Sequence, residues 1–177
     1  MAQRKSKQAL SFVDRYDLWT AAQRRAAAAV ERIIAREKLE TVRFAFCDQH
    51  GVLRGKTLVA SEAASAMRSG VAMTSTLLAK DTSHRTVFKV FTSGGGMGVD
   101  EMAGAGNFIM VADPTTFRVL PWANKTGWVL CDLHFADGSV PPFATRALYR
   151  RVLEGLAGRG YDGAVTVGQD LQIITVA

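Results

Sequence analysis

The stretch of sequence that decides the fold is Asp113-Pro114-Thr115-Thr116-Phe117-Arg118-Val119-Leu120-Pro121-Trp122. Proline cannot donate a hydrogen bond to a sheet. Pro114 and Pro121 are seven positions apart, so a strand between them must be short or lie at a sheet edge. We therefore predict a short strand over residues 116–120. Trp122 is predicted to pack, buried, over an edge of the sheet. On this interpretation the stretch is structural.

Further strands are predicted on both sides of this stretch from alternating or continuous apolar residues. Their expected ranges are 41–47, 52–59, 86–91, 107–112, 127–135 and 160–174. The first two form a hairpin, because Asp48-Gln49-His50-Gly51 supplies turn residues between them. A second turn is expected at Asp137-Gly138. Several strands combined with helices indicate a soluble α+β domain.

Three helices are predicted, at 16–38, 61–70 and 145–159. The first is rich in alanine and amphipathic, and either Asp14 or Asp17 is expected to serve its N-terminus. Ser61 is expected to cap the second helix, which ends at Gly70. The inner face of the third helix is expected to consist of Leu148, Val152, Leu153 and Leu156.

Length and composition limit the class of protein. The chain has 177 residues, of which 48% are hydrophobic, so it fits one domain with a real core. Its apolar runs are far shorter than the roughly 20 residues that span a bilayer, and its start is polar and basic, unlike a secretory signal. Cys47 and Cys131 are interpreted as buried free thiols of a reducing compartment, so we expect a cytoplasmic protein without a membrane partner.

The net charge of +6 is concentrated at one end. Residues 1–56 contain twelve Lys/Arg and six Asp/Glu, whereas residues 57–177 contain ten of each. Such an excess suits a nucleic-acid or acidic-partner surface, or else a solvated helix face with a basic start. No aromatic platform accompanies these cations, as single-strand binding usually requires. We favour the solvated face and do not expect nucleic acid as a partner.

The reactive residue types give no catalytic or metal-binding motif. Residues 93–106 are rich in glycine but lack the Lys and Ser/Thr of a phosphate-binding loop, so a lid or subunit-contact loop is favoured. The histidines do not cluster at metal-ligand spacing. Asp48 and Asp132 are interpreted as turn caps rather than an acid/base pair. Arg54 and Lys56 are interpreted as a solvated strand end, with contact to a neighbouring subunit's ligand as the alternative.

Four segments in order carry a resemblance to a known family. They are VRFAFCDQHGVLRGK at 42–56, the stretch 113–122, WVLCD at 128–132 and PFATRAL at 142–148. Together they resemble the N-terminal β-grasp domain of the glutamine synthetase family, in particular the type I-like branch that includes γ-glutamylpolyamine synthetases. The resemblance covers roughly residues 15–173.

The resemblance implies an α+β fold with a β-grasp-like mixed sheet and packed helices, preceded by an N-terminal amphipathic helix. It divides the chain into a disordered basic start (1–15), that helix (16–40), the grasp domain (41–160) and a truncated start of the catalytic domain (161–177). In the full-length family, ATP and Mg²⁺ or Mn²⁺ support ligation of glutamate to ammonia or an amine, within nitrogen metabolism and glutamine biosynthesis. The grasp domain completes a neighbouring subunit's site.

The resemblance also assigns a candidate substrate loop. The family's Phe-Asp-Gly-Ser-Ser loop, whose Asp recognises ammonium, aligns with residues 71–76, so that Met73 replaces the Asp and Thr74, Ser75 and Thr76 follow. Methionine cannot pair with a cation. Either the amine is bulkier and partly apolar, or the loop has lost its role, or Met73 simply packs against the core.

A second departure concerns the metal ligands. The family's Gly-x-Glu-x-Glu-Phe aligns with residues 168–173, where Asp170 keeps an anionic oxygen and Gln172 offers only a neutral carbonyl. We therefore expect no catalytic residue, metal or cofactor in this chain. It is interpreted as the N-terminal, non-catalytic part of a glutamine synthetase-like ligase, or alternatively as a free-standing interaction module. Self-association or docking onto full-length relatives is expected.

Overall fold

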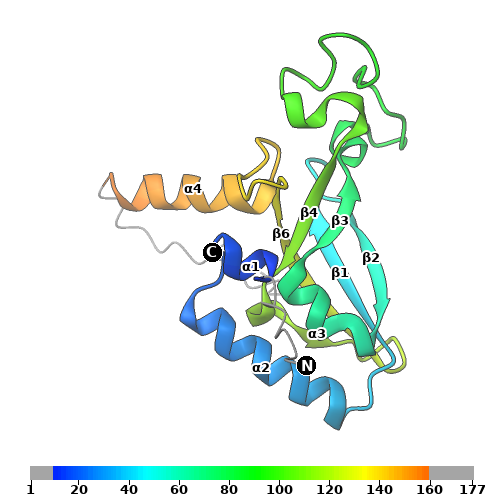
Figure 1. The fold of residues 1–177 in the computed structure, drawn as a ribbon, viewed down its shortest axis with the longest axis vertical. Helices are drawn as coiled ribbons and strands as arrows, with labels where there is room; N and C mark the ends of the chain where they lie inside the picture. The colour runs from blue at the N-terminus through cyan, green and yellow to red at the C-terminus, as the bar shows by residue number, and fades with distance from the viewer. Residues whose placement is uncertain (1–9, 160–177) are drawn as a thin grey trace, which may run out of the picture.

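The computed structural model describes residues 10–159. They form a mixed sheet in the order β2-β1-β6-β4-β3, with β5 paired to β6 (Figure 1). The strands are β1 (Thr41–Cys47), β2 (Leu53–Val59), β3 (Val71–Thr74), β4 (Asn107–Ala112), β5 (Arg118–Val119) and β6 (Thr126–His134). β1 and β6 run parallel, and the other pairs are antiparallel. The α+β class and the mixed sheet are confirmed.

The helices from the first half of the chain cover one face of this sheet. The α-helices are α1 (Phe12–Arg15), α2 (Ala21–Arg36), α3 (Ala60–Ser69) and α4 (Thr145–Ala157), and three short 3₁₀ helices are η1 (Ser75–Ala79), η2 (Asp100–Ala105) and η3 (Pro114–Thr116). Alternate residues of β1, Val42, Phe44 and Phe46, join the main core together with residues of α2 and α3. This is the inward alternation predicted from the sequence.

The N-terminal region forms two helices where one was predicted. α2 begins only after Thr20, whose side chain and that of Gln23 form a reciprocal capping box. Asp14 and Asp17 do not cap α2. Instead, both form ion pairs with Arg24. Because residues 12–15 are helical, the order extends into the range expected to be a disordered start.

Two local predictions are corrected in the middle of the chain. α3 begins at Ala60 without a side-chain cap, so Ser61 does not serve as one, although the helix ends at Gly70 as expected. The strand expected at 86–91 is absent, and only an isolated bridge joins Lys80 to Thr86. The strand expected at 160–174 lies outside the described residues.

α4 starts where expected, but its apolar face is not an inner face. Leu148, Val152 and Leu156 are all exposed, because the helix projects away from the sheet beyond its first turn (Figure 1). The helix start is held by Thr145, whose hydroxyl donates to the carbonyl oxygen of Cys47 at 2.6 Å. The amphipathic spacing therefore predicted the helix correctly, but the prediction that its apolar face is buried was wrong.

The prediction for Trp122 is also wrong. Its side chain is 69% exposed, whereas Phe117 and Leu120 of the same stretch are buried. Strand pairing is limited to β5, and Pro114 starts η3 instead of framing a longer strand. The two cysteines form no disulfide, and Cys131 is buried. None of the helices within residues 10–159 has both the length and the apolar character needed to cross a membrane.

Candidate functional site

The candidate substrate loop, residues 73–76, spans the junction of β3 and η1: Met73 and Thr74 end the strand, and Ser75 begins the 3₁₀ helix. Met73 pairs with Phe108 of β4, which places the loop at the end of an edge strand. Thr74 caps η1, and its hydroxyl lies 3.1 Å from that of Thr76. The backbone N–H of Ser75 donates to the carbonyl oxygen of Gly106 at 2.7 Å. The loop is thereby fastened to the end of the glycine-rich segment.

The side chains of this loop differ in what they offer. Met73 is only partly buried: part of its side chain packs against the main core, and the rest is exposed. Ser75 is fully buried, and its hydroxyl has no hydrogen-bond partner among the described residues. Thr74 and Thr76 remain partly exposed, so the hydroxyls available to a ligand are theirs.

Side chains of the β1–β2 turn contact the backbone of the segment that follows the loop. The side-chain amide of Gln49 donates to the carbonyl oxygens of Leu78 and Lys80, at 2.9 and 3.2 Å. The His50 ring lies 2.9 Å from the same oxygen of Lys80. From β2, Lys56 donates to the carbonyl oxygen of Ala72 at 2.7 Å. These contacts fix the loop's backbone from both sides without using its side chains.

A buried ion pair supports this turn. Asp48 accepts from the backbone N–H groups of His50 and Val52, both at 2.9 Å, so it caps the turn as predicted. It also pairs with Arg54, and both side chains are almost completely buried. Arg54 is therefore not a solvated strand end. Its guanidinium donates further to a ring nitrogen of His84, at 3.2 Å.

The pKa of Asp48 reflects two opposing effects. Burial disfavours its charged form and alone would raise the pKa, but the hydrogen bonds from Arg54, Val52 and His50 outweigh it. The net result is a pKa below the usual value. The carboxylate is thus charged at neutral pH and committed to structure.

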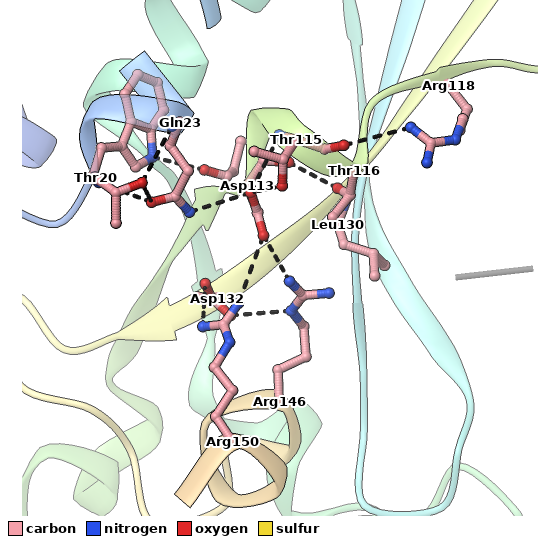
Figure 2. A network of polar contacts seen from close by, with 12 residues as sticks. Thr20, Gln23, Asp113, Thr115, Thr116, Arg118, Leu130, Asp132, Arg146 and Arg150 are labelled. Atoms are coloured by element: carbon pink, nitrogen blue, oxygen red, sulfur yellow. Dashed lines mark hydrogen bonds and ion pairs between the residues drawn. The ribbon is translucent and has the colours of Figure 1, made fainter. Parts of the chain in front are cut away.

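A second polar network joins α2, η3, β6 and α4 around Asp113 (Figure 2). Asp113 accepts from Gln23 at 3.2 Å and from Thr115, and it pairs with Arg146 at 2.9 Å. Asp132 pairs with Arg146 at 3.1 Å and with Arg150 at 2.9 Å. Asp132 therefore anchors α4 rather than capping a turn.

Sequence reasoning missed both networks. Arg54 is the register partner of Phe46, so the alternation of β1 and the hairpin turn together signalled that it points inward. The Asp113 network has a weaker signal. Arg146 and Arg150 share a helix face by their spacing, but no local pattern shows that two acidic residues from η3 and β6 lie opposite.

The remaining predicted residues do not come together as a site. No group of three or more His, Cys, Asp or Glu within residues 10–159 could hold a metal ion. His134 contacts the carbonyl oxygen of Gly138 at 2.9 Å, far along the chain from His50 and His84. Asp170 and Gln172 lie outside the described residues.

The chain is similar in sequence to known proteins over most of its length. No family model matches the chain. A γ-glutamylanilide synthase from an Acinetobacter species is 40% identical over 155 residues, which is 86% of this chain. The γ-glutamylethanolamide synthetase GlnA4 of Streptomyces coelicolor is 36% identical over 143 residues, or 80% of the chain. Over these residues the chain is homologous to glutamine synthetase-like ligases. The recognition made from the sequence is confirmed.

The match covers most of this chain but less than a third of each relative. The chain spans 31% and 29% of the lengths of these two relatives. The ligand-free structure of GmaS superposes with a TM-score of 0.54 over 73% of this chain and 26% of that one. At 23% identity, this similarity shows a shared fold.

Proposed function

We propose that this chain acts as the N-terminal, β-grasp-like part of a glutamate–amine ligase and does not catalyse ligation alone. The observation that carries the proposal is the 40% identity to γ-glutamylanilide synthase over 86% of the chain. The named relatives join glutamate to an amine, which gives the reaction class. The alternative of a free-standing interaction module receives no support from these relatives.

The loop at residues 73–76 is the part that we expect to face the amine. Its backbone is held at Ala72 by Lys56 and at Ser75 by Gly106, so its position is fixed before any ligand arrives. Preorganised groups lose little entropy on binding. Met73 offers an apolar surface where a carboxylate would select ammonium. This favours an amine with an apolar group.

In this proposal, ATP and divalent metal are held elsewhere in a complete ligase. The charge on the transferring phosphoryl group would be stabilised there. The present residues contribute the fixed loop and a surface that meets other parts of the ligase, either from the same protein or from a neighbouring subunit. Self-association, or association with full-length glutamine synthetase-like subunits, is part of the proposal.

The direct test is a γ-glutamyl hydroxamate assay with glutamate, hydroxylamine, ATP and Mg²⁺ or Mn²⁺. The chain alone is expected to form no product above a heat-inactivated control. A chimera in which residues 15–159 replace the matching segment of the Acinetobacter γ-glutamylanilide synthase is expected to turn over.

Amine selection supplies a sharper readout in that chimera. Met73→Asp should shift its preference from aniline toward ammonia, whereas Arg25→Gln, a change at an exposed position of α2, should not. A chimera that assembles as the parent does but forms no product, or a chain that turns over alone, would overturn the proposal.

A further inference from the structure

A groove of about 440 Å³ lies on the sheet face opposite the main core. Ala45 of β1 and Gly55 of β2 are register partners in its floor. The lining also includes Trp128, Leu120 and Trp122. The volume falls within the roughly 300–1,000 Å³ of small-molecule sites. None of the residues of the substrate loop takes part in it.

The hollow is built into the backbone. A Cβ atom added at Gly55 would overlap the carbonyl oxygen of Phe44, so the close approach of β2 to β1 requires glycine there. Its partner Ala45 contributes only a methyl group. The depression between the two strands therefore does not depend on the rotamer of a long side chain.

The walls of the groove are aromatic and partly open. Trp128 packs with Ala45, Leu120 and Leu130 in a small cluster that is separate from the main core. Trp122 is 69% exposed, although it lines the same groove. An exposed indole beside a formed hollow presents a flat apolar surface that favours stacking with a ring.

The charge of the groove is one-sided. Its lining contains Arg43, Arg54 and Lys56, and no aspartate or glutamate. Arg54 and Lys56 are register partners of Phe46 and Phe44, so their side chains point to the face of the main core. Arg54 is neutralised by Asp48, and Lys56 donates to a backbone carbonyl. Arg43 is exposed and is the register neighbour of Trp128. Within residues 10–159 it has no hydrogen-bond or ion-pair partner, so its guanidinium is available to an anion.

We propose that this groove binds a small aromatic carboxylic acid, with its ring against Trp122 and Trp128 and its carboxylate paired with Arg43. A planar guanidinium matches a carboxylate with two parallel hydrogen bonds. Inorganic phosphate would use the cation but leave the exposed indole of Trp122 uncovered. The site goes beyond the proposed ligase function and does not depend on it.

The test uses indole-3-acetate and its uncharged amide, indole-3-acetamide, as a matched pair in isothermal titration calorimetry. Both are expected to bind with one-to-one stoichiometry, and the acid should bind about tenfold more tightly because its hydrogen bonds to Arg43 are charge-assisted. Arg43→Gln should remove this difference and leave the affinity for the amide unchanged. Trp122→Ala should weaken both by about tenfold.

The control is Arg25→Gln, which neutralises an exposed arginine of α2 outside the groove and should leave both affinities unchanged. Arg43 and Trp122 are exposed, so their variants should melt at the parental temperature. Absence of saturable heat for both probes up to about 10 mM would overturn the proposal. So would an acid affinity that survives Arg43→Gln, or equal affinity for acid and amide in the parent chain.

Discussion

The two faces of the sheet use neighbouring residues of the same strands for different purposes. On one face, Phe44 and Phe46 of β1 are fully buried beneath the helices. On the other, Arg43 is exposed, and Ala45 belongs to a small separate cluster beside Trp128. A step of one residue along β1 thus moves from the core to a groove.

The helix-covered face is expected to determine stability, and the opposite face is expected to determine binding. The helix-covered face buries large apolar side chains, which is where most folding free energy arises. The opposite face keeps Trp122, Leu53 and Val59 exposed, where they contribute little to folding and can meet a ligand or partner. Substitutions on the two faces should therefore differ in kind.

The largest effect is expected for Phe44→Ala. Phe44 has no exposed surface, and truncating a buried phenylalanine costs about 3–5 kcal/mol in free energy of unfolding. Its neighbour Arg43→Ala should change that free energy by less than about 0.5 kcal/mol. Urea unfolding followed by circular dichroism measures both. Equal losses would show that the two faces do not differ as described.

Arg54→Met sharpens the comparison on strand β2. It leaves Asp48 buried without its cation, which we expect to cost about 3 kcal/mol. Arg43→Met removes the same charge from an exposed position of β1 and should be close to neutral. If Arg54→Met were also neutral in the same unfolding experiment, the turn would not depend on the pair.

The same pair predicts how stability depends on acid. The folded pKa of Asp48 is lowered from its usual 3.8, so its contribution is fully present above that value and is lost as pH falls toward the folded pKa. Unfolding free energy should therefore decrease below about pH 4. In Asp48→Asn this part of the decrease should be absent. An identical acid profile for parent and variant would contradict the assignment.

Sequence patterns predicted the parts of the fold that depend on local chemistry. The alternation of β1, the turn before Leu53 and the end of α3 at Gly70 follow from periodicity and glycine conformation. The pattern of Thr20 followed by Gln23 three residues later is also typical of a capping box, although the predicted helix start did not use it.

The failures share a physical cause. The exposed face of α4 and Trp122 have the composition of buried elements, and spacing alone cannot tell whether another element covers them. The Asp113–Arg146 contact joins residues 33 positions apart, so no local pattern announces it. The candidate loop was located by family resemblance. Its contact with Gly106, and the contact of the preceding Ala72 with Lys56, join residues too far apart in the sequence for a local pattern to predict.

The smallest effect is expected for Trp122→Ala, which reverses what the sequence predicted for this residue. Trp19 is the matched reference, because it is 4% exposed and its indole N–H donates to the carbonyl oxygen of Ala112 at 2.8 Å. Trp19→Ala should cost about 3–5 kcal/mol. Trp122→Ala should cost less than about 0.5 kcal/mol, since its ring already faces water. A melting temperature lowered as far as that of Trp19→Ala would mean that Trp122 is covered in solution, and it would then be unavailable as a wall of the groove.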